Sequence, residues 1–408
     1  MTFFKQTIRD VPLEHTTVLV RADYNVPLDK GGKIADDLRI RASVPTLRYL
    51  LDHGCKVVIM SHLGRPEGRD MSLSLEQIGE RLAFYLGVPI HFVNDCKGDR
   101  VHQTIKTAPK NSVILLENLR FYAQEEANDH AFAQAIAKAT GARYFVQDGF
   151  GVVHRAHAST QAIALCIPGV AGLLLEHEYE TITHAMSEPD RPLIAIMGGA
   201  KVSDKIQVIE RFIQKADTIL VGGAMANTFL AYKGKKMGKS KLENDETKTL
   251  DAIYAAATKK VGADKVDSFI MLPSDVAVAK RVDGSEKRRT SKVNELADDD
   301  IALDIGDKTI EAYTAQLSEA GTVIWNGPVG YSTLPEFAHG SARIALALAT
   351  HPNVTSIVGG GDTAEFVLKW DGQGGKSFTH VSTGGGAGLE LMAGDKLPGV
   401  ECLLDASV

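Results

Sequence analysis

The sequence has few cysteines and little excess charge, and each shortage excludes a class of protein. Its four cysteines (Cys55, Cys96, Cys166 and Cys402) lie far apart in 408 residues and form no CxxC pair, so neither a zinc knuckle nor a disulfide framework is indicated. Lysine and arginine total 45 against 51 aspartates and glutamates, which argues against an electrostatic grip on nucleic acid or on an anionic membrane. The remaining composition is that of an ordinary globular protein.

Long hydrophobic runs are also missing. The first residues, MTFFKQTIRDVPLEH, hold no apolar stretch of signal-peptide length. Residues 158–175 carry no charge, but they include Pro168, Gly169 and Gly172, which suit a membrane-spanning helix poorly. We expect a buried strand, a turn and a helix start there. The protein is therefore expected in the cytoplasm.

Short β-branched runs recur along the chain and alternate with segments of helical periodicity. Such runs lack polar alternation when both faces of a parallel sheet are covered by helices. A length of 408 residues suggests roughly two or three domains. We therefore predict an α/β fold of two doubly wound, Rossmann-like parallel-sheet domains. The runs are 17–20, 56–60, 89–93, 113–116, 143–146 and 161–165 in the first half, and 193–197, 218–221, 268–272, 322–325, 355–358 and 379–382 in the second.

The domain junction is predicted at a helix. Leu175, Tyr179, Ile182 and Met186 are spaced as one helical stripe, and two prolines follow within Ser187–Pro192, where a helix cannot continue. We place an interdomain helix at 173–188, an N-terminal domain before it, and a C-terminal domain from 189 onward.

Glycine-rich turns follow four runs of the second half. They are Gly198-Gly-Ala-Lys201, Gly222-Gly-Ala224, Gly359-Gly-Gly-Asp-Thr363 and Gly384-Gly-Gly-Ala387. Glycine lets backbone N–H groups approach a phosphate, and a following helix adds a favourable dipole. Asp362 offers an oxygen ligand for Mg²⁺, and Lys201 and Lys205 offer compact positive charge. The segments around Gly238-Lys-Ser240 and Gly375-Lys-Ser377 lack the earlier glycine of a Walker A motif.

Cations and polar groups follow the runs of the first half instead. Ligands of open α/β sheets bind beyond the carboxyl ends of the strands, so these residues predict a pocket for a small phosphorylated or carboxylated anion. With phosphate-binding glycines in the other half, they indicate phosphoryl transfer, which depends mainly on positioning and charge. The residues are Arg21, Asp23, Asn25, Arg39, His62, Arg65, Arg120, His154, Arg155 and His157.

Several motifs together resemble phosphoglycerate kinase, and they run in the family's order over nearly the whole chain. They are RADYNVPLD (21–29), DDLRIRASVPT (36–46), SHLGRP (61–66), LLENLRFY (115–122), FGVVHRAHAS (150–159), GGAKVSDKI (198–206), WNGPVG (325–330), GGGDTA (359–364) and STGGGAGLEL (382–391). The resemblance implies reversible phosphoryl transfer between 1,3-bisphosphoglycerate and ADP, with Mg²⁺, in a monomer whose domains close about a hinge. It also implies that residues 389–408 return to the N-terminal domain. That glycerate-binding domain then comprises residues 1–172 and 389–408, and the nucleotide-binding domain comprises residues 189–388.

The resemblance assigns site residues by their place in these motifs. Asp23, Asn25, Arg39, His62, Arg65, Arg120 and Arg155 are expected to hold the glycerate ligand. Arg39, Lys201, Gly361 and Gly384 are expected to act on the transferring group. Nucleotide contacts are expected from Gly199, Ala200, Lys201, Lys205, Gly222, Gly223, Asn326, Pro328, Gly330, Thr333, Gly360, Gly361, Asp362 and Thr363, with Asp362 on Mg²⁺.

One departure from the family pattern concerns the nucleotide. After WNGPVG the family usually has Val-Phe-Glu, whose Glu binds the ribose, and this chain has Tyr331-Ser-Thr333. We predict altered nucleotide affinity or selectivity with the chemistry retained.

Two other functions compete with this interpretation. A weakly active paralogue that serves as a scaffold or regulator is disfavoured by Arg39, Lys201 and Asp362. A dinucleotide-dependent oxidoreductase would need GxGxxG and an acidic residue ~20 positions on, and neither GGGDT nor GGAK fits that pattern.

Overall fold

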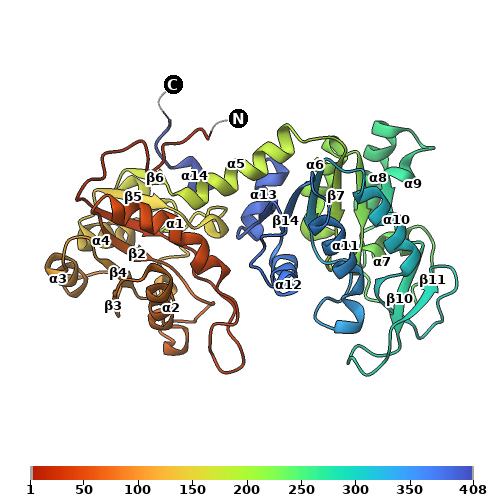
Figure 1. The fold of residues 1–408 in the computed structure, drawn as a ribbon, viewed down its shortest axis with the longest axis horizontal. Helices are drawn as coiled ribbons and strands as arrows, with labels where there is room; N and C mark the ends of the chain where they lie inside the picture. The colour runs from red at the N-terminus through yellow and green to blue at the C-terminus, as the bar shows by residue number, and fades with distance from the viewer. Residues whose placement is uncertain (1–2, 407–408) are drawn as a thin grey trace. The chain divides into compact units, whose positions relative to one another are not determined.

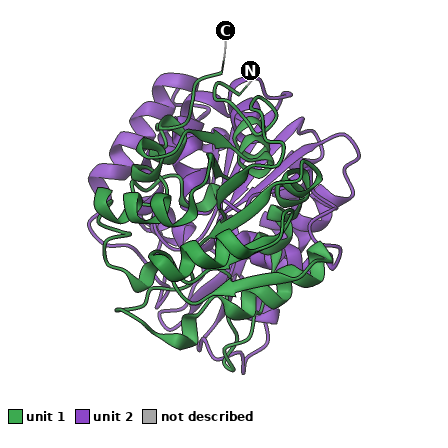
Figure 2. Ribbon diagram, turned by 90° about the vertical axis from the view of Figure 1, so that its left-hand side faces the viewer, with its two compact units in different colours: residues 1–180, 395–408 green, residues 181–394 purple. Residues whose placement is uncertain are grey.

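The computed structural model describes residues 3–406 and divides the chain into two compact units (Figure 2). Unit 1 comprises Met1–Glu180 and Asp395–Val408, and unit 2 comprises Thr181–Gly394. The sequence-based limits, 1–172 with 389–408 and 189–388, differ from these units at each boundary. As domain limits they stay a prediction.

Unit 1 is built on a six-stranded sheet with every neighbouring pair parallel. The strand order is β3-β4-β2-β1-β5-β6, so the chain starts in the middle and builds first to one side and then to the other. The topological switch point lies between β1 and β5. The strands are β1 (Thr17–Arg21), β2 (Lys56–Met60), β3 (Ile90–Val93), β4 (Val113–Leu116), β5 (Tyr144–Gln147) and β6 (Gly169–Ala171), and the α-helices are α1 (Leu38–Asp52), α2 (Glu76–Leu86), α3 (Asp99–Thr107), α4 (His130–Thr140), the first part of α5 (Leu173–Ser187) and α14 (Pro398–Glu401).

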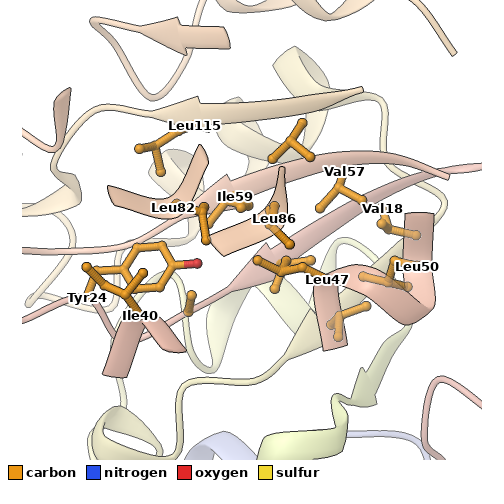
Figure 3. Close-up of a cluster of buried hydrophobic side chains, with 14 of the residues drawn as sticks. Val18, Tyr24, Ile40, Leu47, Leu50, Val57, Ile59, Leu82, Leu86 and Leu115 are labelled. Atoms are coloured by element: carbon orange, nitrogen blue, oxygen red, sulfur yellow. The ribbon is translucent and has the colours of Figure 1, made fainter. Parts of the chain in front are cut away.

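The core of unit 1 forms where α1 and α2 cover one face of this sheet. Val18 and Val57 from the strands meet Leu47 and Leu50 of α1 and Leu82 of α2 (Figure 3), and none of these side chains is exposed to solvent. Burial of one such side chain stabilises the fold by about 1.5–3 kcal/mol. The sequences of these strands are continuous apolar runs because their side chains are buried. The packed sheet in turn fixes the positions at which the loops after its strands begin.

Unit 2 repeats the plan with a second six-stranded sheet, again parallel throughout. Its order is β15-β14-β13-β7-β8-β9, which places the switch point between β7 and β13. In Figure 1 the colour of this unit runs from yellow-green to blue with residue number. The strands are β7 (Leu193–Met197), β8 (Thr218–Val221), β9 (Ile270–Met271), β13 (Thr322–Asn326), β14 (Thr355–Gly359) and β15 (His380–Val381), and the α-helices are α6 (Ile206–Lys215), α7 (Gly223–Tyr232), α8 (Thr247–Val261), α9 (Val266–Phe269), α10 (Asp307–Leu317), α11 (His339–Ala349), α12 (Gly361–Asp371) and α13 (Gly386–Ala393).

A small antiparallel sheet in unit 2 was not predicted. Its order is β11-β10-β12, from β10 (Asp275–Ala279), β11 (Arg289–Lys292) and β12 (Ile301–Ile305). The exposed β11 reads RTSK and carries no apolar pattern that would announce a strand. The basic segment between β10 and β11 is a hairpin connection.

The prediction of two parallel-sheet α/β domains is confirmed, and the errors lie at marginal elements. The run at 161–165 is a 3-10 helix, Ala162–Leu165, and the strand of that region is β6. The run at 268–272 is strand only at Ile270–Met271 because α9 occupies the preceding residues. No helix of the described residues 3–406 is both long and apolar enough to cross a bilayer.

Candidate functional site

The predicted glycerate residues of unit 1 gather at the carboxyl ends of its central strands. Asp23 and Asn25 follow β1, His62 and Arg65 follow β2, Arg120 follows β4, and Arg155 follows β5. Arg39 lies in the first turn of α1. Because β1 and β5 flank the switch point of the sheet, this is the edge where an open α/β fold binds ligands.

Backbone and carboxylate contacts orient the first of these arginines. Arg39 Nη1 lies 3.1 Å from an Asp23 carboxylate oxygen and donates to the Asn25 carbonyl at 2.8 Å. The Asn25 side chain in turn accepts from Gly64 N at 2.8 Å. The Arg39 side chain is 25% exposed. It is therefore held in place while part of it remains open to a ligand.

The other arginines form a second group around Gly64. Arg120 Nη1 donates to the Gly64 carbonyl at 2.6 Å, and Nη2 lies 3.1 Å from Glu126. The pKa of Arg120 is lowered by burial first, and the positive charges of Arg155 and Arg65 lower it further. The structure thus places Arg120 within electrostatic reach of both Arg155 and Arg65, and a bound anion would relieve the repulsion between these like charges.

The histidines beside these arginines do not carry charge at neutral pH. Burial, with nearby arginines, lowers the pKa of His62 well below its usual value. Burial likewise lowers the pKa of His154 and His157, in both cases to about 4. The positive charge of this cluster therefore comes from arginine alone, and the histidines offer neutral hydrogen bonds.

Unit 2 contains a cavity of about 810 Å³, a size typical of ligand pockets. Apolar side chains of β12 and its neighbours line one part of it, and the first turns of α12 line another. The lining residues are Gly199, Ala200, Gly223, Ala224, Lys239, Lys241, Val282, Ile301, Ala302, Leu303, Pro328, Gly330, Tyr331, Ser332, Thr333, Asp362, Glu365, Phe366 and Lys369.

Some predicted nucleotide residues line this cavity directly, and others lie behind it. Lining residues among them are Gly199, Ala200, Gly223, Pro328, Gly330, Thr333 and Asp362. A Cβ on Gly223 would come within 2.9 Å of backbone atoms of Gly199 and Pro328, and its φ is +64°. A Cβ on Gly222 would lie 2.5 Å from Val329, so Gly222 permits close packing of the β8 end against the β13 end and does not line the cavity.

The buried polar residues behind the cavity are linked to the glycine-rich turn after β14. Lys205 Nζ donates to the carbonyls of Gly198 at 2.8 Å and Asn326 at 3.2 Å. Burial lowers the pKa of Lys205 to about 8, and the negative charge of Asp362 opposes that shift. Thr363 Oγ1 accepts from Gly327 N at 2.8 Å. The buried amide nitrogen of Asn326 has no hydrogen-bond partner among residues 3–406, and such a donor is an unusual feature that a ligand would satisfy.

Among the remaining predicted residues, Gly361, Lys201 and Gly384 differ in how accessible they are to a phosphate. Gly361 opens α12, and the first helical hydrogen bond runs from Ala364 N to Gly360 O, so the N–H groups of residues 361–363 precede the first bonded donor of the helix. Lys201 is exposed and does not line the cavity. Gly384 N already donates to Ser382 Oγ at 3.0 Å, so this N–H would have to exchange partners to contact a phosphoryl group.

Asp362 fits a magnesium ion that arrives with a nucleotide. Its carboxylate lines the cavity at the start of α12, beside Lys205. Mg²⁺ in nucleotide sites is commonly held by one or two carboxylates together with phosphate oxygens and waters. One carboxylate at this position suits that pattern.

The apolar part of the cavity was missed at the sequence level. Val282, Ile301, Leu303 and Tyr331 come from the β10–β11 connection, from β12 and from the loop after β13. Lys239 and Lys241 belong to a segment fixed to β12, because Lys239 N donates to Asp300 O and Ala302 N donates to Ser240 Oγ. The contact of these segments with the glycine-rich turns could be predicted only if the antiparallel sheet had been predicted first.

Comparisons with known proteins agree over the length of the chain. The model of the family described as "Phosphoglycerate kinase" matches residues 8–395. Curated phosphoglycerate kinases of Dictyoglomus turgidum and Moorella thermoacetica are 46% and 45% identical, each over 98% of this chain and over 98% and 99% of their own. Phosphoglycerate kinase structures from Pyrococcus horikoshii and Coxiella burnetii match with TM-scores of 0.84 and 0.82 at 33% identity, covering 98% of each chain.

Proposed function

The chain belongs to the phosphoglycerate kinase family, and from this premise we propose which residues carry each part of the reaction. The enzyme transfers a phosphoryl group reversibly from 1,3-bisphosphoglycerate to ADP, giving 3-phosphoglycerate and ATP. In that step the bond between phosphorus and the 1-carboxyl oxygen breaks, and a bond from phosphorus to a β-phosphate oxygen of ADP forms. Neither the oxidoreductase nor the weakly active paralogue gains support.

The observation that supports the assignment is that arginines follow the strands at the switch point of the sheet in unit 1, whereas glycine-rich turns and the start of α12 follow those of the sheet in unit 2. In unit 1, Asp23, Asn25, Arg39, His62, Arg65, Arg120 and Arg155 bind the glycerate ligand. Arginine suits this task because its planar guanidinium pairs with carboxylate and phosphate through two parallel hydrogen bonds. Asp23 and Asn25 act by orienting Arg39 and the Gly64 loop.

In unit 2 the nucleotide occupies the cavity with its base against the apolar lining and its phosphates at α12. Gly199, Ala200, Gly223, Pro328 and Gly330 frame the adenosine, while Gly222 supports them. The phosphates contact Lys205, Asn326, Thr363 and the N–H groups of Gly360 and Gly361. Lys201, which is exposed and does not line the cavity, would turn toward the phosphates when they are bound. The Asn326 amide, which has no partner among residues 3–406, and the position of residues 361–363 in the first turn of α12 support this placement.

The transferring group is neutralised by Arg39 and Lys201, with N–H groups of Gly361 and Gly384. Arg39 and Lys201 carry their charge before the reaction begins, which favours the transition state as charge shifts between oxygens, whereas the Gly384 N–H must first leave Ser382 Oγ. No general base is required, because in the reverse direction the attacking 3-phosphoglycerate carboxylate is ionised at neutral pH. Positioning and charge therefore supply the catalysis.

Asp362 would hold Mg²⁺. The ion, when bound with nucleotide, offsets negative charge on the β- and γ-phosphates and helps to orient them. Asp362 and Lys205 bring opposite charges to the same end of the cavity. The chain's own part is to fix this carboxylate at the first turn of α12.

The remaining expectations are part of the proposal. We expect a monomer in the cytoplasm that binds neither nucleic acid nor membrane. Thr333 lines the cavity where the family usually carries Glu, so a hydroxyl replaces a carboxylate toward the ribose. The altered nucleotide affinity or selectivity expected from this change stays a prediction.

The whole proposal is tested by measuring ATP turnover that depends on 3-phosphoglycerate, in a coupled assay with the full-length protein. Turnover that requires both substrates and Mg²⁺ is expected. Binding of both ligands without turnover would instead favour the scaffold or regulatory paralogue. Turnover without 3-phosphoglycerate would contradict the assignment of the arginine cluster.

A further inference from the structure

A buried chain of hydrogen bonds lies behind the proposed glycerate site. Arg21, the last residue of β1, donates from Nε to Ser159 Oγ at 2.7 Å. Ser159 donates from its hydroxyl to Glu125 Oε1 at 2.5 Å and from its backbone N to Glu125 Oε2 at 3.0 Å. The side chains of Arg21 and Glu125 are each 1% exposed, and their nearest charged atoms are 3.8 Å apart. A buried positive charge is thus matched by a buried carboxylate through an intervening hydroxyl.

The free end of this chain contacts His62. Arg21 Nη2 lies 3.3 Å from His62 Nδ1. A guanidinium has only donors and keeps its protons in proteins, so in this contact Nδ1 must be the acceptor. A neutral imidazole carries one proton, and here that proton is therefore on Nε2. Among the described residues Nε2 has no hydrogen-bond partner.

The surroundings of His62 keep the ring neutral. The positive groups facing it are Arg21, Arg120, Arg39 and the weakly basic His157, and together with burial they lower its pKa. The nearby carboxylates are engaged elsewhere, Glu125 with Ser159 and Asp23 with Arg39. The imidazole consequently offers one N–H donor whose direction is fixed by the contact at its other nitrogen.

We propose that Glu125, Ser159 and Arg21 are positioning residues that hold His62 as its neutral Nε2–H tautomer, so that it donates one hydrogen bond to an oxyanion of the glycerate ligand. This inference rests on the proposed function for the identity of that ligand. The tautomer itself follows from the contact between Arg21 and His62. A ring free to carry its proton on Nδ1 would point a lone pair at the anion and weaken its binding.

The test reads the tautomer directly in the full-length protein. Imidazole ¹⁵N shifts of ligand-free wild type, assigned to His62 by comparison with His62→Asn, are expected to show a protonated Nε2 and a bare Nδ1 from pH 6 to 8. In Ser159→Ala the guanidinium loses its anchor, and we expect a mixture of tautomers and 3-phosphoglycerate affinity about tenfold weaker. Arg21→Lys, a second variant that keeps the buried charge, is expected to raise the pKa of His62 because the ammonium no longer engages Nδ1.

The matched control is Ser74→Ala. The Ser74 hydroxyl also donates to a buried glutamate of unit 1, Glu117 Oε2 at 2.9 Å, but it contacts neither Arg21 nor His62. This variant should lose comparable stability while the His62 shifts and the affinity remain those of wild type.

Two sets of results would overturn the proposal. One is a wild-type His62 that is charged or protonated on Nδ1 at pH 7, and the other is Ser159→Ala and Arg21→Lys proteins that keep both the tautomer and the affinity. Failure of wild type to bind 3-phosphoglycerate would overturn the proposed function and the role of the donor. The ligand-free shifts would still decide whether the network sets the tautomer.

Discussion

The two units share an architecture and differ in the residues that their strands lead into. Each has a six-stranded parallel sheet with its switch point beside the first strand, β1 or β7. In unit 1 arginines held by carboxylates and carbonyls lie beyond that point, whereas in unit 2 glycines and a helix N-terminus do. The same backbone plan thus carries two different kinds of donor beyond its strands, charged side chains in unit 1 and main-chain N–H groups in unit 2.

This difference determines how each site can be disrupted. A side-chain site fails when a group is removed, as in truncation of an arginine. A backbone site has no side chain that could be truncated. It fails when an added methyl group prevents the main chain from approaching the ligand. The two kinds of site can therefore be told apart by the kind of substitution that disables them.

Removal of the cations assigned to the transferring group should reduce turnover most. Arg39→Ala and Lys201→Ala are each expected to lower kcat by about 10²–10³-fold, because preorganised charge at the reacting group is lost. Both side chains are at least partly exposed, so the far-UV circular dichroism and the thermal midpoint should stay close to wild type. A kcat within threefold of wild type in both proteins would contradict the assignment.

Obstruction of the backbone site should abolish nucleotide binding without truncating any group. In Gly223→Ala the new Cβ meets backbone of Gly199 and Pro328 at 2.8–2.9 Å. We expect unfolding to become easier by about 1–3 kcal/mol beyond the backbone strain, together with loss of ADP binding in calorimetry.

The control for this obstruction is Gly372→Ala. Gly372 has nearly the same φ, +63° against +64°, but a Cβ there meets nothing within 4 Å. It should therefore show only the strain of an L-residue in this region, about 1–2 kcal/mol, with ADP binding intact. Equal losses of affinity in the two variants would contradict the steric explanation.

The affinities of the two sites should respond differently to pH. The pKa of Lys205 is lowered to about 8 by burial, so its ammonium is present at pH 7 and is lost as the pH rises toward 9. Affinity for Mg-ADP should fall over this range, while affinity for 3-phosphoglycerate stays level because arginines supply the charge of unit 1.

Lys205→Arg is the variant that isolates this effect, since a guanidinium remains charged. Its Mg-ADP affinity, measured by calorimetry between pH 7 and 9, should no longer follow pH. A wild-type profile that is level across pH 8 would contradict the role of Lys205.

The smallest effect is expected at Thr333. Thr333→Glu restores the carboxylate usual in the family and should strengthen ADP binding by about 2–10-fold through one added hydrogen bond. Ser332→Glu, at the neighbouring lining position, is the control and should give no gain. Ordinary ADP affinity and strict adenine preference in wild type would count against the prediction of altered nucleotide recognition.

Sequence reasoning worked where a single local pattern carried the information. Runs such as 56–60 and 193–197 are buried on both faces and coincide with β2 and β7, so hydrophobicity alone revealed the two sheets. The glycine turns and the strand-end arginines could be read in the same way. Within each unit, these residues lie at one edge of that unit's own sheet because its strands are parallel.

The features that sequence reasoning missed depend on contacts between distant segments. The run at 161–165 has strand-like composition, yet it forms a 3-10 helix. β11 is polar and exposed, so its pairing with β10, in the sheet that brings Val282 and Leu303 to the cavity, could not be read from its own residues. Likewise, nothing local links Arg21 to Ser159 and Glu125, because that network joins the end of β1 to two segments that are distant in the sequence.

The most direct test of the account is a crossed titration of the full-length protein by calorimetry. Wild type, Arg39→Ala and Asp362→Asn would each be titrated separately with 3-phosphoglycerate and with Mg-ADP. We expect Arg39→Ala to lose affinity for 3-phosphoglycerate and to keep its affinity for Mg-ADP, and we expect Asp362→Asn to show the reverse. Loss of both affinities in either variant, or of neither, would contradict the assignment of one ligand to each unit.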